Sequence, residues 1–276
     1  MTAPDTRFAA RVAARLAARV RTRAGARLAA SLAALVALAV SPLSASAQQQ
    51  LTVSAAASLT DAFREIGARF EAARPGTTVR FNFAASGVLI QQILQGAPVD
   101  VFASADQETM DRGVQQKALD AATRRDFASN TLVMIAPAQG GPALSRVADL
   151  AGPDVKRIAI GKLATVPVGR YSRQALDAAG VWGAIVTKLV YADSVRQVLD
   201  YVARGEADAG FVYRTDAQIM KDKVRIVLTA TGHSPVTYPV AVVADSKQAA
   251  LARDFATFLS GPDAQGILAR FGFGKP

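Results

Sequence analysis

The chain has 276 residues, of which 51% are hydrophobic and 20% are charged. This composition can bury a full hydrophobic core, so it excludes a disordered or low-complexity protein. Cysteine is absent, which excludes disulfides, thiolate metal sites and a lipidated cysteine anchor.

The first 47 residues have the pattern of a secretory signal peptide. Arginines recur up to Arg27 and are followed by the uncharged run Leu28 to Val40. Ser41-Pro42 then interrupts the helix, and Ala45-Ser46-Ala47 is the small-x-small sequence that signal peptidase requires, so we predict cleavage before Gln48. The uncharged run has 13 residues, whereas a membrane-spanning helix needs about 20, which argues against a membrane anchor.

Two other interpretations of the leader stay open. Its arginines recur every fourth residue, as in a basic amphipathic transit peptide, although the cleavage sequence disfavours that interpretation. The basic segment is also unusually long, and no methionine lies between Met1 and Met110, which fits a start codon placed too far upstream.

The positive charge of the chain is concentrated in this leader. The whole chain has a formal net charge of +10, and the leader holds seven arginines against the single acid Asp5, so its removal leaves +4. No cluster of lysine or arginine interleaved with aromatic residues remains, and we expect no nucleic-acid partner. We predict that the remaining basic residues, Arg170 and Arg196 included, are solvated surface residues.

Beyond the leader, short β-like runs alternate with helical periods, which is typical of an α/β fold with a largely parallel sheet. Three strand–helix units come first, and their predicted strands are Leu51 to Ala57, Val79 to Phe83 and Val99 to Ala103. Apolar residues from Leu59 to Phe70 recur at helical spacing after the first strand. Ser58 and Ser86 stand at the first two strand–helix junctions, and Asp106 is expected to cap the third helix.

The next part of the chain begins with a buried strand, Thr131 to Ala136, and a glycine- and proline-rich loop, Pro137 to Pro142. The elements expected after it are strand Arg157 to Gly161, helix Tyr171 to Ala179, strand Lys188 to Ala192, helix Val195 to Ala203, and strands Ala209 to Tyr213 and Val224 to Thr229. The long apolar strand Val236 to Ala244 follows, and two helices end the chain, with Pro262 in the first turn of the last.

These patterns predict two α/β lobes, each with a mostly parallel sheet flanked by helices, joined by crossing segments near Thr131 and near Tyr238. We expect residues 48–133 and 239–276 to form lobe 1 and residues 134–238 to form lobe 2. No internal sequence repeat is found. Ligands of such folds bind at the carboxyl ends of the strands, so the cleft between the lobes is the expected site.

Six segments carry the candidate binding chemistry. They are Ala55 to Thr60, Phe83 to Ser86, Asp100 to Asp106, Val166 to Tyr171, Gly210 to Tyr213 and Tyr238 to Val243. In this order they resemble the motifs of the periplasmic molybdate-binding proteins of ABC transporters, and they extend over nearly all of the chain after Gln48.

This resemblance implies a two-lobed periplasmic-binding-protein fold of the class II type that holds molybdate, or its analogue tungstate, as an oxyanion. The residues that it implies as ligands are Ser58, Ser86, Val168, Val195 and Tyr213. It further implies a monomeric periplasmic protein that is not an enzyme and has no cofactor and no direct metal-cation ligand. The implied partners are an inner-membrane ABC permease and its ATPase.

The chemistry of these positions agrees with an oxyanion ligand. Ser58, Ser86, Val168 and Val195 each stand where a strand or loop turns into a helix, and helix N-termini offer free N–H groups and partial positive charge. A serine hydroxyl can rotate to donate and an amide only donates, so a valine can hold an anion through its main chain. A lining of donors also penalises a protonated oxyanion such as hydrogen phosphate, whereas sulfate has to be excluded by cavity size.

Other functions of the same residues stay open. Taken alone, Ser58 and Ser86 would be helix caps and Tyr213 a core tyrosine. A secreted hydrolase with Ser58 or Ser86 as nucleophile is a second hypothesis, but the sequence has no Gly-x-Ser-x-Gly elbow, and its one histidine, His233, lies in a turn-like segment. A third hypothesis keeps the binding function and changes the cargo to sulfate, thiosulfate or phosphate.

Overall fold

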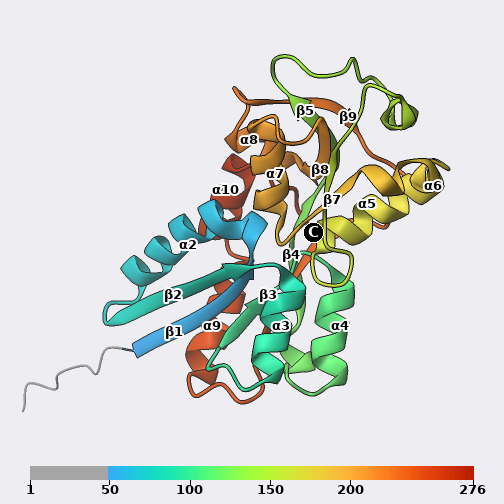
Figure 1. The fold of residues 1–276 in the computed structure, drawn as a ribbon. Helices are drawn as coiled ribbons and strands as arrows, with labels where there is room; N and C mark the ends of the chain where they lie inside the picture. The colour runs from blue at the N-terminus through green and yellow to red at the C-terminus, as the bar shows by residue number, and fades with distance from the viewer. Residues whose placement is uncertain (1–48) are drawn as a thin grey trace, which may run out of the picture. The chain divides into compact units, whose positions relative to one another are not determined.

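The computed structural model describes residues 49–276, which form an α/β fold built on two five-stranded sheets (Figure 1). The predicted signal peptide and its cleavage site before Gln48 lie outside the described residues. Within 49–276, no helix is both long and apolar enough to cross a membrane.

The first sheet belongs to lobe 1 and has the strand order β2-β1-β3-β10-β4. Its strands are β1 (Gln49–Ala56), β2 (Thr77–Ala84), β3 (Val101–Ala103), β4 (Arg125–Asn130) and β10 (Val236–Val242). β1 pairs in parallel with β2 and β3, and β10 runs antiparallel to both β3 and β4. Four strands therefore point the same way and β10 points against them.

The second sheet belongs to lobe 2 and has the strand order β7-β6-β8-β5-β9. Its strands are β5 (Leu132–Pro137), β6 (Ile158–Gly161), β7 (Leu189–Ala192), β8 (Ala209–Tyr213) and β9 (Val224–Thr229). β6 pairs in parallel with β7 and β8, and β5 runs antiparallel to β8 and β9. The pairing pattern is that of the first sheet, with β5 in the place of β10, so the lobes share a topology that the sequence does not reveal as a repeat.

Helices connect the strands and cover the sheets (Figure 1). The α-helices are α2 (Thr60–Ala73), α3 (Ser86–Leu94), α4 (Gln107–Gln115), α5 (Pro167–Ala178), α6 (Trp182–Ile185), α7 (Val195–Ala203), α8 (Arg214–Ile219), α9 (Ala249–Phe258) and α10 (Pro262–Arg270). Short 3-10 turns are η1 (Ala57–Leu59), η2 (Ala121–Thr123), η3 (Val147–Ala151) and η4 (Val186–Lys188). The apolar face predicted between Leu59 and Phe70 is buried in α2, and Pro262 opens α10 as expected.

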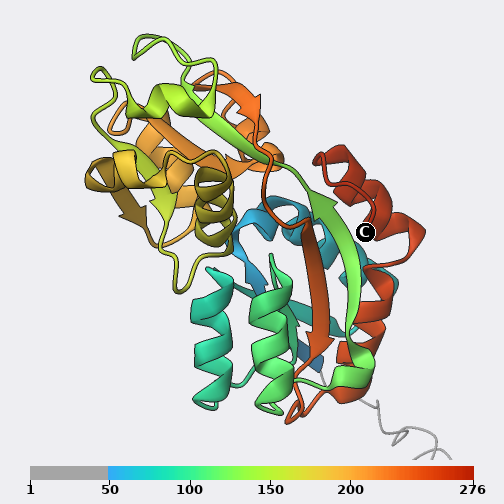
Figure 2. The same cartoon turned by 90° about the vertical axis from the view of Figure 1, so that its right-hand side faces the viewer.

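Two chain segments cross between the lobes, as Figure 2 shows for the green and the orange-red strands. The chain leaves the first sheet at Asn130 and enters the second at Leu132, and it returns between Thr229 and Val236. The lobe limits expected from the sequence, 133/134 and 238/239, fall inside β5 and β10. We propose Thr131 and the segment 230–235 as the crossings, because the hydrogen-bonded sheets change there.

Some elements differ from the sequence-based expectation. β4 is not predicted by the apolar pattern, because it is an edge strand with polar residues such as Arg125 and Asp126 beside the buried Phe127. Helix α5 begins at Pro167, four positions before the predicted start at Tyr171, since proline suits the first helical turn. The short helices α6 and α8 are also missed by periodicity, which needs a longer window.

Candidate functional site

A small cavity lies where the carboxyl ends of strands from both sheets meet. Its lining residues are Ala56, Ala57, Ser58, Ala84, Ala85, Ser86 and Ala105 from lobe 1 and Val166, Pro167, Val168, Val195 and Tyr213 from lobe 2. All five residues predicted as ligands are in this set, and no charged side chain is. The structure thus brings the predicted site residues together around one uncharged cavity, and their role as ligands remains a prediction.

Each of the two serines forms one hydrogen bond with a residue of its own lobe. The Oγ of Ser86, at the start of α3, accepts from the backbone N–H of Ala105 at 3.0 Å. The Oγ of Ser58, in η1 after β1, lies 3.1 Å from the phenolic oxygen of Tyr238. Both serines are buried. Since the N–H of Ala105 is a fixed donor, the hydroxyl proton of Ser86 is free to point at a ligand.

Val168 and Val195 contribute backbone N–H groups from the first turns of α5 and α7. Within the described residues, neither N–H has a protein acceptor. Pro167 begins α5 without an N–H of its own, and the hydroxyl of Ser194 caps α7 by accepting from Gln197 rather than from Val195. The two valine amides are therefore the free helix-terminal donors on the lobe 2 side of the cavity.

Tyr213 supplies a hydroxyl that has no hydrogen-bond partner among the described residues, although the side chain is only 1% exposed. It ends β8, and its ring packs edge-on against Tyr171 and Tyr238. Burial, with smaller contributions from Tyr238 and Tyr171, raises the pKa of Tyr213 well above its usual value, so this hydroxyl stays protonated. Burying a hydroxyl without a hydrogen-bond partner costs free energy of folding. Because Tyr213 lines the cavity, its hydroxyl is suited to donate to a ligand there.

The arrangement presents hydroxyl and amide donors and no side-chain carboxylate at the cavity. Donors gathered at helix N-termini suit an anion with several acceptor oxygens. In the described part of the chain, neither serine has a histidine or carboxylate hydrogen-bonded to it that would act as a general base for a nucleophile. The geometry therefore supports anion binding.

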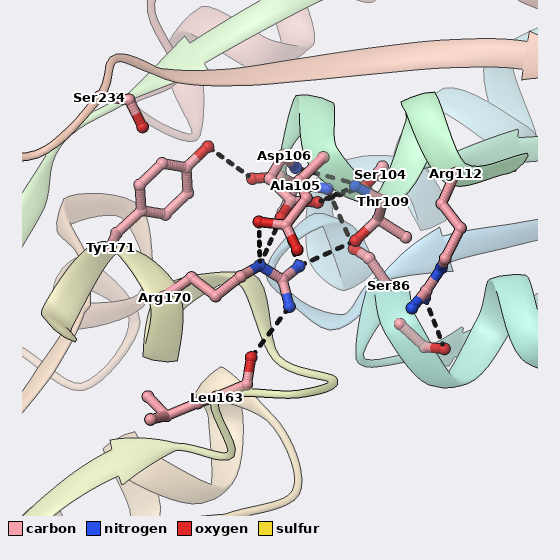
Figure 3. A network of polar contacts seen from close by, with 12 residues as sticks. Ser86, Ser104, Ala105, Asp106, Thr109, Arg112, Leu163, Arg170, Tyr171 and Ser234 are labelled. Carbon is pink, nitrogen blue, oxygen red and sulfur yellow. Dashed lines mark hydrogen bonds and ion pairs between the residues drawn. The ribbon is translucent and has the colours of Figure 1, made fainter. Parts of the chain in front are cut away.

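Arg170 connects the two lobes next to the cavity, so its predicted place on the solvated surface is wrong. Its side chain is 15% exposed, and from α5 it donates through Nε to Asp106 at 3.0 Å and through Nη2 to Asp106 and Thr109 at the start of α4 (Figure 3). Nη1 donates to the carbonyl of Leu163 in its own lobe at 3.1 Å. Asp106 caps α4 as predicted and, in addition, holds this interlobe ion pair.

Arg196 forms a second connection between the lobes, and its predicted solvated position is also wrong. It pairs with Asp216 of lobe 2 at 2.7 Å and with Asp61 of lobe 1 at 2.8 Å, and it donates to the carbonyl of Ser58 at 3.4 Å. Burial alone would lower the pKa of Arg196, but the two carboxylates raise it. Neither Arg170 nor Arg196 lines the cavity, which agrees with leaving them out of the predicted ligand set.

A third contact joins the lobes through backbone alone. The N–H of Gly87 in α3 donates to the carbonyl oxygen of Thr165 at 2.9 Å. A Cβ at position 87 would lie 2.6 Å from that oxygen, so the close approach depends on glycine.

Three residues that support the site were not identified from the sequence. Ala105 and Tyr238 hydrogen-bond the two serines, and Asn130 donates to Tyr238 at 3.2 Å. Ala105 and Tyr238 lie in two of the six motif segments, but nothing in the sequence shows that Tyr238 meets Ser58, which is 180 positions away. Asn130 lies outside all six segments, and it reaches Tyr238 because it ends β4 at the crossing between the lobes.

Together the two lobes, their paired crossings and the cavity between the strand ends define a two-lobed solute-binding protein. The sequence model of the bacterial extracellular solute-binding protein family matches residues 51–274, and the chain belongs to this family. The predicted fold class is confirmed by this match and by the sheets.

Individual relatives agree with the resemblance seen in the motifs. ModA of Escherichia coli strain K12, a molybdate-binding protein, is 39% identical over 241 residues, which cover 85% of this chain and 93% of ModA. The periplasmic molybdate-binding protein of Azotobacter vinelandii has a solved structure with a TM-score of 0.71 and 25% identity, covering 82% of this chain and 99% of that one. The sulfate-binding protein SubI of Mycobacterium tuberculosis, at 18% identity and a TM-score of 0.73 over 82% of this chain and 86% of its own, shares the fold.

Proposed function

We propose that this protein captures molybdate, or its analogue tungstate, in the cavity between the lobes and delivers it to an ABC importer. The observation that carries the proposal is the uncharged cavity lined by donors from both lobes, in which the hydroxyl of Tyr213 is buried and unpartnered within the described part of the chain. The similarity to ModA, a molybdate-binding protein, supports molybdate among the oxyanions that such donors fit.

In this proposal the ligands are the hydroxyls of Ser58, Ser86 and Tyr213 and the main-chain N–H groups of Val168 and Val195. Each hydrogen bond to a charged oxygen contributes about 1.5 to 3 kcal/mol net. Five such bonds can offset the cost of closing the lobes and leave about 8 kcal/mol, which corresponds to micromolar affinity. No arginine is needed as a counter-ion at the cavity.

We further propose that the protein is exported to the periplasm by a cleaved signal peptide, acts as a monomer and has no enzymatic activity or cofactor. The leader sequence and the extracellular family support export. An inner-membrane ABC permease and its ATPase are then the partners. N-terminal sequencing of the mature protein would test the cleavage before Gln48, and an esterase assay would test the absence of hydrolase activity.

Isothermal titration calorimetry of the purified mature protein tests the cargo. Molybdate, tungstate, sulfate and phosphate are titrated separately at pH 7.5 and constant ionic strength. We expect micromolar or tighter binding of molybdate and tungstate and at least about 100-fold weaker binding of sulfate and phosphate, a difference of about 2.7 kcal/mol. Preference for sulfate or phosphate would overturn the assignment of the cargo.

A further inference from the structure

A chain of polar groups, buried at Ser58 and Tyr238 and half-buried at Asn130, leads from Ser58 away from the cavity. The Oγ of Ser58 lies 3.1 Å from the phenolic oxygen of Tyr238, which lies 3.2 Å from the amide nitrogen of Asn130. Tyr238 is fully buried, and Ser58 is only 2% exposed. The contacts alone leave open which hydroxyl donates to which.

The side chain of Asn130 settles the direction of these bonds. Its Oδ1 accepts from the backbone N–H of Thr131 at 2.8 Å, and a backbone N–H can only donate. The amide nitrogen therefore faces Tyr238 and the hydroxyl of Thr215, which it reaches at 2.9 Å. Because this nitrogen also only donates, the oxygen of Tyr238 is an acceptor from Asn130.

Tyr238 has one proton, and the direction of that proton follows. With its oxygen already accepting from Asn130, the remaining neighbour is the Oγ of Ser58, so Tyr238 donates to Ser58. Burial raises the pKa of Tyr238 above its usual range, which keeps the proton on the phenol. Ser58 then accepts from Tyr238, and its own proton is left for the cavity.

We propose that Asn130 and Tyr238 are positioning residues that fix Ser58 as a hydrogen-bond donor toward the bound oxyanion. This inference rests on the proposed function and adds to it a cause for the selection of fully deprotonated oxyanions. A ligand oxygen that carries a proton would meet the proton of Ser58, because with Tyr238 donating to Ser58 that proton has no other acceptor among the described residues. Ser86 reaches the same state through the backbone N–H of Ala105, so only the Ser58 side depends on side chains.

The place of the relay in the fold supports a link to the lobe crossings. Asn130 is the last residue of β4, directly before the crossing at Thr131, and Tyr238 lies in β10 shortly after the return crossing. Both crossing strands therefore contribute to the orientation of one ligand donor in η1.

A double-mutant cycle tests the relay through molybdate titration by calorimetry. Tyr238→Phe removes the donor to Ser58, and we expect the Kd for molybdate to rise about 2- to 10-fold, the range for a neutral hydrogen bond. In a Ser58→Ala background the same substitution should change Kd by less than about 1.5-fold, because no serine proton is left to orient. An equal rise in both backgrounds would mean that Tyr238 acts through packing and would overturn the proposal.

Asn130→Asp provides a second variant that keeps the shape of the side chain. One carboxylate oxygen still accepts from Thr131, and the other accepts from Tyr238, which reverses the bond direction and turns the proton of Ser58 toward Tyr238. We expect Kd to rise at least about 10-fold, and the rise to become smaller in the Tyr238→Phe background, where only the repulsion between the new charge and the anion remains. An equal rise of Kd in the wild-type and Tyr238→Phe backgrounds would mean that the new charge causes the whole effect, and it would refute the relay.

The wild-type titration separates this inference from the proposed function. If wild-type protein binds molybdate and neither cycle shows coupling, the relay alone fails. If wild-type protein binds none of molybdate, tungstate, sulfate and phosphate, the proposed function fails and the relay fails with it.

Discussion

The substitution Tyr213→Phe tests whether Tyr213 is a ligand donor or a structural residue. The hydroxyl of Tyr213 is fully buried and has no hydrogen-bond partner among the described residues. In the molybdate complex the substitution removes one bond to a charged oxygen, which contributes about 1.5 to 3 kcal/mol, so we expect Kd to rise about 10- to 150-fold. In the ligand-free protein the substitution removes no hydrogen bond to another described residue. We therefore expect the free energy of unfolding to stay constant or increase.

Two assays measure these opposite effects. Calorimetric titration gives Kd, and thermal unfolding without ligand gives Tm, which shifts by about 2 to 4 °C for each kcal/mol in a domain of this size. Tyr201→Phe is the control, since Tyr201 lies in α7 of the same lobe and does not line the cavity. An unchanged Kd, or a fall in Tm together with the loss of affinity, would refute the ligand role of Tyr213.

Three further predictions concern Ser86, the interlobe ion pair of Arg170 with Asp106, and the buried Asp216. Ser86→Ala should raise Kd for molybdate about 10-fold or more at unchanged fold by circular dichroism, because one donor is lost; an unchanged affinity would remove Ser86 from the site. Arg170→Met should raise Kd and enlarge the radius of gyration of the molybdate-loaded protein in X-ray scattering, since it leaves Asp106 buried without its partner. The double variant Arg170→Met, Asp106→Asn should recover part of the affinity, and no recovery would contradict the pairing. Burial raises the pKa of Asp216 from 3.8 to about 6, although Arg196 acts in the opposite direction. Between these two pH values the folded protein keeps the carboxyl proton of Asp216, whereas the unfolded chain has lost it. Relative to Asp216→Asn, wild-type protein should therefore gain unfolding free energy as the pH falls from about 6 to 4 in urea titrations, and a relative loss would contradict the raised pKa.

The sequence predicts those helices and strands in which apolar residues recur regularly over a long run of residues. Helix α7 and strands β8 and β9 have the predicted limits, because apolar runs are bounded there by polar turns. The edge strand β4 escapes prediction, since its outward residues are charged and only Phe127 and Ala128 are buried. The equivalence of the two sheets also escapes, because it lies in strand order and not in shared residues.

The sequence predicts the positions of the candidate ligands better than the groups that support them. Ser58, Ser86, Val168 and Val195 are implied by the resemblance of the motifs, and each stands where a strand or loop turns into a helix, which is a local feature. The partners of these groups come from distant parts of the chain, as with Tyr238 and Ser58, so no local pattern reveals them. Arg170 was misplaced on the surface for the same reason, because an isolated arginine gives no sign of a buried acid 64 positions away.

The shared topology of the lobes has a consequence for unloading. Each lobe presents its strand ends to the cavity. The proposed donors therefore divide into two half-sites, with two serine hydroxyls on one side and two amides and a phenol on the other. When the halves separate, an oxyanion retains roughly half of its hydrogen bonds, and a complex of about 8 kcal/mol falls to about 4 kcal/mol, from micromolar to millimolar. A permease that only spreads the halves would thus discharge the cargo, with no change of protonation or covalent structure in the carrier.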